Sequence, residues 1–187
     1  MRLKPLEEPA PNGHQAPRAQ LSARPGGAQG PFQVLLRSPG LGVRMEELSS
    51  YCIKESSLPP RLRELALLEA ARAFEAGHSW NAHVGKAQEA GVDAEALSRF
   101  ARGEEPGFAR EDEQLLHRFA QQLLHGHCVD DQLYDRAAEY FGEQALVDLV
   151  GCLGTFTALA MLLNAFDIAL PPDAAPPFPG PVRASSH

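Results

Sequence analysis

Prolines and glycines divide this chain into short segments in which apolar residues recur every three or four positions. Between Pro31 and Ala169 each such segment is bounded by a helix-breaking residue, and none alternates apolar and polar residues as a strand does. Ser38-Pro39 is a typical boundary, because a serine N-cap followed by a first-turn proline starts a helix. The sequence therefore predicts an all-α fold.

The same boundaries predict where each helix begins and ends. Helices are expected to start after serine, aspartate or proline and to stop before glycine or proline. The expected ranges are about 39–57, 60–75, 79–90, 94–102, 110–124, 131–141 and 143–165. Asp93 is the expected cap of the fourth of these helices, and Asp130 or Asp131 is the expected cap of the sixth.

The chain has 187 residues, which is enough for one domain with a sizeable core. Residues 1–30 are rich in proline, glycine, alanine and glutamine and show no periodicity, so we expect an extended N-terminal arm. Residues 31–170 form the predicted helical domain, and residues 171–187 form a proline-rich C-terminal tail.

The net charge and the cysteines indicate which partners and which cellular compartment to expect. The formal charge of −7 leaves no basic stripe, which argues against nucleic acid as a partner. The three cysteines, Cys52, Cys128 and Cys152, show neither CxxC nor metal-type spacing. We expect reduced thiols in a cytoplasmic protein, with Cys128, which is near a loop, as the most reactive.

A membrane role is not expected. The longest apolar region, residues 145–169, is interrupted by polar residues and glycines, as in a buried helix. The N-terminal segment MRLKPLEEPAPNG has no apolar core of the kind that a signal peptide needs. Gly151 and Gly154 would allow another helix or subunit to approach closely.

One cluster of residue types indicates proton chemistry. Ser79 and His83 are four residues apart and share a helix face, while Gly77 gives His78 the backbone freedom to point the same way. If the helices 60–75 and 79–90 form an antiparallel hairpin, Glu64 lies near His83. A carboxylate beside an imidazole fixes its tautomer and stabilises its protonated form, as a general acid/base requires.

Simpler interpretations of these residues also stand at this point. Glu64 could pair with Arg61 or Arg63, and His78 could be a solvated loop residue.

The remaining histidines indicate no site. His117 lies on the polar face of its helix, where we expect it to be solvated. The segment His125-Gly-His127-Cys128 offers three potential ligands without a fourth at a suitable spacing, so no metal is expected.

Three segments resemble the carboxymuconolactone decarboxylase / alkylhydroperoxidase-D-like family. They are LRELALLEAA at residues 62–71, SWNAHVGKA at 79–87 and AGV at 90–92, and the similarity extends over about residues 31–170. The resemblance implies a compact multi-helix bundle, a small-molecule substrate and a homo-oligomer, commonly a trimer or hexamer, although a dimer is also open. It also implies that the sites lie near subunit boundaries.

The resemblance also implies roles for individual residues. In the thiol-peroxidase branch a CxxC pair precedes the histidine, and a glutamate and a second histidine relay protons. These relay positions correspond to Glu64, His78 and His83, whereas the cysteine positions hold Ala76 and Ser79. Peroxide reduction through a CxxC pair is therefore not expected.

The decarboxylase branch, which also lacks CxxC, is the closer match. It implies His83 as the acid/base, Glu64 as its orienting partner, His78 as a second donor, and no cofactor. Ser79 and Trp80 are candidates for substrate contact, with Trp80 expected rather to pack at a helix or subunit interface.

Three functions remain open from the sequence. The first is a cofactor-free enzyme that decarboxylates or isomerises a small organic acid or lactone. The second is a catalytically inactive, oligomeric binding or scaffold member of the family. The third is a peroxidase that uses a cysteine outside the motif, such as Cys128.

Overall fold

The computed structural model describes residues 2–4, 6, 13–23, 28–171 and 173–179. Within these ranges all regular secondary structure is helical, so the all-α prediction is confirmed. Asp93 and Asp130 cap helices as expected, because their carboxylates accept hydrogen bonds from the N–H groups of Ala96 and Leu133, both at 2.8 Å. The helices are α1 (Gln15–Ser22), α2 (Pro31–Leu35), α3 (Pro39–Lys54), α4 (Pro60–Ala73), α5 (Gly77–Glu89), α6 (Ala94–Arg102), α7 (Glu111–Gln121), α8 (Asp131–Phe141) and α9 (Glu143–Ala165), with a π-helical segment, Gln122–Gly126, after α7.

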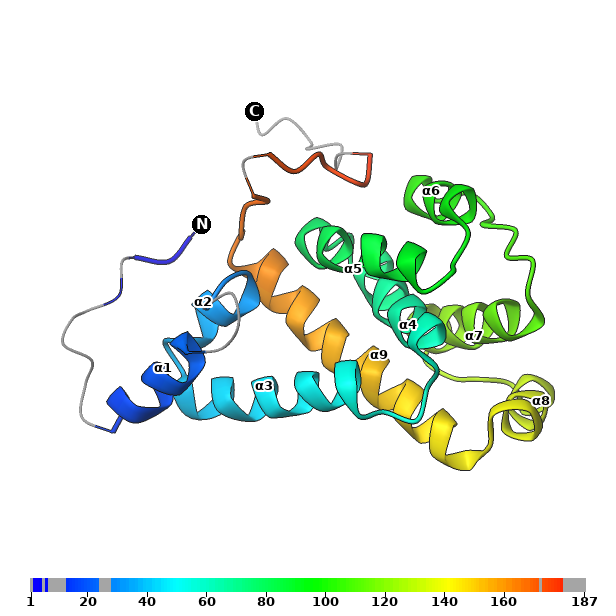
Figure 1. Ribbon diagram of the computed structural model, residues 1–187, viewed down its shortest axis with the longest axis horizontal. Coiled ribbons are helices and arrows are strands. Elements are labelled where there is room, and N and C mark those ends of the chain that lie inside the picture. The colour runs from blue at the N-terminus through cyan, green and yellow to red at the C-terminus, as the bar shows by residue number, and fades with distance from the viewer. Residues whose placement is uncertain (1, 5, 7–12, 24–27, 172, 180–187) are drawn as a thin grey trace.

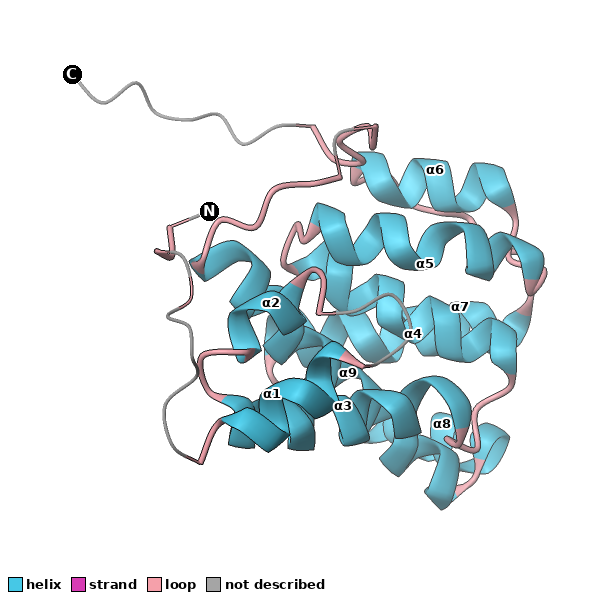
Figure 2. Cartoon of the chain, turned by 60° about the vertical axis from the view of Figure 1, so that its left-hand side comes forward, coloured by secondary structure: helices cyan, strands magenta, loops and turns pink. Residues whose placement is uncertain are grey.

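Helix α4 is the centre of the bundle and packs against α5, α7 and α9. Its residues from Leu62 to Ala71 are buried except for the half-buried Arg63, as expected for a helix with apolar residues almost all round. Figure 1 shows α1 and α2 at one end of the molecule and α7 and α8 at the other, and Figure 2 shows α5 between α6 and the rest of the bundle. Because α4 packs against helices on several sides, its side chains can reach several separate parts of the interior.

Helix α9 runs over the whole predicted range, Glu143–Ala165. Its most apolar stretch has a mean hydropathy of 2.0, and by length and composition alone it could cross a membrane. However, 56% of that stretch is buried within the protein, where α9 packs against α3 and α4. This is the pattern of a core helix.

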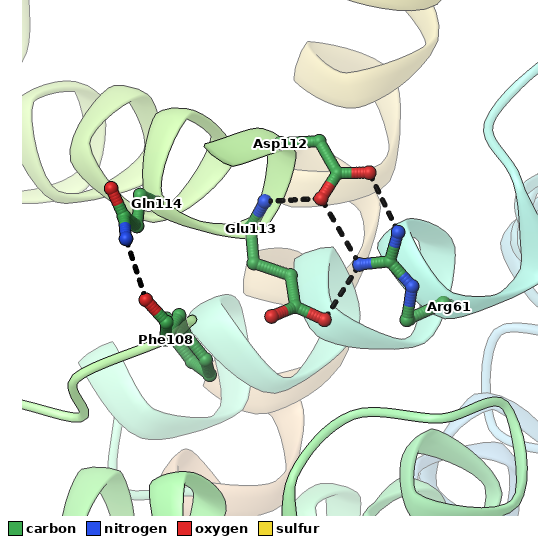
Figure 3. Close-up of polar contacts among 5 residues, drawn as sticks. All are labelled: Arg61, Phe108, Asp112, Glu113 and Gln114. Atoms are coloured by element: carbon green, nitrogen blue, oxygen red, sulfur yellow. Dashed lines mark hydrogen bonds and ion pairs between the residues drawn. The ribbon is translucent and has the colours of Figure 1, made fainter. Parts of the chain in front are cut away.

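Two ion pairs join the start of α4 to the start of α7. The Arg61 guanidinium donates to both carboxylate oxygens of Asp112 at 2.6 and 3.2 Å, and to Glu113 at 2.6 Å (Figure 3). A carboxylate oxygen of Asp112 also accepts a hydrogen bond from the backbone N–H of Glu113. This N–H lies in the first turn of α7, where backbone N–H groups have no acceptor within the helix. This cluster fixes α7 against α4.

The N-terminal region differs from the prediction in one respect. Residues Gln15–Ser22, within the predicted extended arm, form α1, whose Leu21 is buried against α3. Gly42 makes this contact feasible, because a Cβ atom at that position would lie 2.5 Å from a methyl carbon of Leu21. The arm is therefore partly helical, because the side chain of Leu21 packs into the core. Residues 1, 5, 7–12 and 24–27 of this arm lie outside the described residues.

The described part of the C-terminal tail, residues 171 and 173–179, is non-helical and lies against the start of α5. The Asn81 side chain donates to the carbonyl of Ala175 at 3.0 Å, and Phe178 is buried beside Trp80, with ring centroids 5.3 Å apart. Residues 172 and 180–187 of the predicted tail lie outside the described residues.

Candidate active site

The structure brings Glu64 of α4 and His83 of α5 into contact. A short turn joins the two helices, with Glu75 in the left-handed region at φ 47°, and α4 and α5 then pack along each other. The His83 Nδ1–H donates to Glu64 Oε2 at 2.8 Å, and the two residues are only 6% and 8% exposed. A charge-assisted hydrogen bond in such a dry environment fixes both the orientation of the ring and its tautomer.

The alternative partners of Glu64 are engaged elsewhere or unpaired. Arg61 binds Asp112 and Glu113 instead (Figure 3). The Nε atom of Arg63 is buried and has no hydrogen-bond partner among the described residues. The Glu64 carboxylate is therefore committed to His83 rather than to a neighbouring arginine.

A cavity of about 200 Å³ lies beside His83. Because Glu64 occupies Nδ1, the nitrogen that His83 has left for a ligand is Nε2. The ring of His83 meets that of Phe156 edge to face, with centroids 5.2 Å apart. The cavity is lined by side chains from the loop before α2 and from α2, α3, α5 and α9, namely Gln29, Pro31, Phe32, Ser49, Ile53, His78, Ser79, Ala82, His83, Lys86, Phe156, Leu159 and Leu163.

His78 lies on the wall of the same cavity. Its ring packs so closely on Gly30 that a Cβ atom there would lie 2.4 Å from Nε2, and Gly30 has a φ of +55°. Its Nδ1 atom is buried without a hydrogen-bond partner among the described residues. Burial lowers the pKa of His78, against a smaller opposing effect of a hydrogen bond with the backbone of Ala169. His78 is thus a half-buried, neutral imidazole at neutral pH rather than a solvated loop residue.

The two predicted substrate contacts occupy different places. Ser79 is 7% exposed and lies on the cavity wall. Trp80 packs edge to face against Phe100 and Phe178, with ring centroids 5.7 and 5.3 Å away, and is not one of the residues that line the cavity. Its place in this structure is a packing position, of the kind that the sequence favoured for it.

Lys86 is a cavity residue that the sequence analysis missed. Among the lining residues it alone carries a permanent charge, and it makes no ion pair with any described residue. The signal was present in the sequence, because Ser79, His83 and Lys86 follow each other at four- and three-residue spacing on one face of α5. A cationic group near His83 suits an anionic ligand.

The thiols lie outside this cavity. Cys52 and Cys152 are buried between α3 and α9, while Cys128 is exposed. A hydrogen bond from Cys152 lowers the pKa of Cys52 to about 7, and the same contact raises the pKa of Cys152. None of the three lines the cavity, and among the described residues no three His, Cys, Asp or Glu side chains gather as a metal site.

Residues 39–111 match the family model of the carboxymuconolactone decarboxylase family. This match covers 73 of the 187 residues, and over this segment the chain is similar to that family. The matched segment begins with α3 and ends at the first residue of α7, so it contains Glu64, His78 and His83. No curated protein matches the chain. The matched segment thus supplies α3 and α5 to the cavity, and α9, outside the match, supplies Phe156, Leu159 and Leu163.

Proposed function

We propose that the chain is a cofactor-free enzyme of the carboxymuconolactone decarboxylase type that performs general acid/base chemistry on a small organic acid or lactone. One observation carries this proposal. A buried carboxylate, Glu64, holds the imidazole of His83 at 2.8 Å, at the wall of a cavity large enough for a small molecule. A structural hydrogen bond would serve equally well in a filled core, whereas the His83 member of this pair lines a cavity.

The proposed reaction is decarboxylation, in which the bond between a carbon atom and its carboxylate group breaks. Carbon dioxide leaves, and the electron pair remains on the carbon atom as an enolate or an equivalent anion. His83 then delivers a proton from Nε2 to that carbon, while Glu64 stabilises the imidazolium before the transfer. His78 lies on the same wall, so its ring is placed to contact the substrate. Isomerisation of a lactone would use the same groups to remove and return one proton.

Size and charge favour a compact anionic substrate. A cavity of 150 Å³ holds benzene, so about 200 Å³ suits a ring compound of roughly ten non-hydrogen atoms. Phe32, Ile53 and Leu159 supply apolar wall, and Lys86 supplies the positive charge that would hold a carboxylate.

Peroxidase chemistry is a weaker candidate. The positions that carry the redox cysteines in the thiol-peroxidase branch hold Ala76 and Ser79, which favours a branch without CxxC. Cys128 is exposed and lies on no wall of the cavity, while the buried Cys52 and Cys152 have no access to it. Acid/base chemistry is the function that the cavity residues support.

We also propose that the chain is cytoplasmic and forms a homo-oligomer, commonly a trimer or hexamer in this family. Helix α9 leaves Val147, Val150 and Met161 exposed at 71, 44 and 55% on its outer side. A Cβ atom added at Gly151 or Gly154 of the same helix would meet no described residue within 4 Å, so a second helix has room to approach. Light scattering coupled to size-exclusion chromatography tests this point, and a monomer at all concentrations would contradict it.

Carbon dioxide release tests the function. The purified protein is incubated with carboxymuconolactone, the compound in the family name, and with a panel of small lactones and keto acids. Turnover of at least one of them, lost in the presence of a competing carboxylate, supports the proposal. Tight binding of these compounds without any turnover would contradict it and favour an inactive, oligomeric binding protein.

A further inference from the structure

Helix α4 carries a second buried carboxylate that the proposed function does not use. Glu69 is 0% exposed, and its Oε1 accepts the Nδ1–H of His117 at 2.7 Å. Its Oε2 accepts the side-chain N–H of Gln121 at 2.9 Å. The expectation that His117 is solvated is wrong, because Glu69 draws its ring into the interface between α4 and α7, where its side chain is 12% exposed.

The Glu69–His117 pair repeats the arrangement of Glu64 and His83 on the other side of α4. In both cases a carboxylate of α4 engages Nδ1 of a histidine from a neighbouring helix and leaves Nε2 free. The ring of His117 is held edge to face by Phe100 and Phe108, with centroids 5.3 and 5.5 Å away. Its orientation is therefore fixed from three directions.

His117 borders a hollow of about 500 Å³. Apolar wall comes from Phe74, Phe100 and Pro106, and Arg72 lies on the same wall. The Nε of Arg72 donates to the carbonyl of Phe100 at 3.0 Å, which anchors the guanidinium there. The lining of the hollow is mostly polar, and it combines a smaller apolar wall with two nitrogen donors from fixed side chains.

Electrostatics favour the protonated form of His117. Burial by itself lowers the pKa of His117, but the hydrogen bond and the charge of Glu69, helped by the charge of Glu105, outweigh burial and raise it. Of the other acids at the hollow, Glu104 is paired with Arg102 at 2.7 Å and Glu75 with Arg72 at 3.7 Å. Glu105 is the remaining carboxylate without an ion pair among the described residues, and a ligand anion would compete with it for His117.

We propose that this hollow is a second ligand site, which binds a small organic carboxylate with a flat apolar body. The imidazolium of His117 donates from Nε2 to the ligand carboxylate, Arg72 contributes a second positive charge, and Phe74 and Phe100 contact the apolar body. This site is separate from the cavity beside His83, and its existence does not depend on the proposed function.

Benzoate is the probe, because it is a flat carboxylate small enough for the hollow. It is titrated into the full chain while the ring Cε1–H signals of the histidines are followed by two-dimensional NMR, with His117 assigned by substitution. We expect a saturable shift of the His117 signal. No shift up to tens of millimolar benzoate, or a shift that never saturates, would overturn the proposal.

Two isosteric variants make the test specific. Glu69→Gln keeps an acceptor for His117 but removes the negative charge, so the pKa of His117 falls. The affinity for benzoate, measured from the shift of the His117 signal, should then fall roughly tenfold, because a charged hydrogen bond is about twice as strong as a neutral one. Glu64→Gln, the matched change at the other pair, leaves the response of His117 unchanged. Equal responses in both variants would overturn the proposal.

A second measurement keeps the proposal testable if Glu69→Gln fails to fold. His117→Phe retains a ring against Phe100 and Phe108 and removes the Nε2 donor. We expect the number of benzoate sites per chain, measured by isothermal titration calorimetry, to fall by one. An unchanged number of sites would overturn the proposal, whatever happens at the cavity beside His83.

Discussion

Replacing Glu64 with glutamine tests the acid/base pair with the smallest change in shape. Glu64 is 8% exposed and accepts the Nδ1–H of His83 at 2.8 Å. If the new amide oxygen takes the place of the carboxylate, a charged hydrogen bond worth about 1.5–3 kcal/mol becomes a neutral one worth about 0.5–1.5 kcal/mol. A loss of about 1.4 kcal/mol in stabilising the imidazolium corresponds to a tenfold slower reaction.

The amide can also present its NH₂ group to the ring, which makes a larger effect possible. Nδ1 of His83 would then accept, and the ring proton would move to Nε2 on the cavity side. The equivalent carboxylate-to-amide change beside the histidine of a serine protease lowers kcat by about 10⁴ through the wrong tautomer. We therefore expect Glu64→Gln to lower kcat by between about ten and 10⁴.

The assay is carbon dioxide release at saturating substrate, with a thermal melt of each variant. We expect Glu64→Gln to melt near the wild type, because the amide still fills the space and pairs with His83. Glu89→Gln is the control, since Glu89 is an exposed residue near the end of α5. A Glu64→Gln protein whose kcat equals that of the control would refute the assignment of Glu64 as the partner of a catalytic histidine.

Three further predictions concern other residues of the cavity and the thiols. Lys86→Gln should raise KM for an anionic substrate by about 10–100-fold with little change in kcat, because it removes a charged hydrogen bond; an equal KM in the variant would exclude Lys86 as the anion-binding group. Burial lowers the pKa of His78 below 6.5, so the folded chain binds fewer protons than the unfolded chain as the pH falls below that value, and stability decreases there. Urea unfolding above and below that pH should show a smaller decrease in the free energy of unfolding for His78→Gln than for the wild type. An identical decrease would contradict His78 as the cause. Alkylation of the exposed Cys128 with iodoacetamide should leave turnover unchanged, and a large loss would support thiol chemistry instead.

Much of the helix pattern was predictable because it depends on local residues. Asp93 and Asp130 cap their helices through their own side chains, and α9 begins after Gly142 and ends at Ala165 as expected. Helix α1 was not predicted, because its only apolar anchor is Leu21 and the site that receives it is formed by Gly42 of another helix. A single leucine gives no periodicity to detect.

The candidate site was predictable in part for the same reason. Glu64 and His83 belong to adjacent helices, so the sequence predicted their contact on the condition that these helices form an antiparallel hairpin. The contact between Glu69 and His117 joins residues 48 positions apart, and the amphipathic pattern of α7 placed His117 on its polar side. Lys86 was overlooked because an exposed lysine on a helix is ordinary until the structure shows a cavity beside it.

The most direct test of His83 as the acid/base is the rate of carbon dioxide release by His83→Ala, measured together with its circular dichroism and its oligomeric mass. His83→Gln is measured beside it, because alanine leaves the buried Glu64 without a partner and glutamine can still donate to it. If His83 is the acid/base, both variants keep the fold and the assembly and lose at least about 10²-fold in kcat. Wild-type turnover in either folded variant would contradict this assignment.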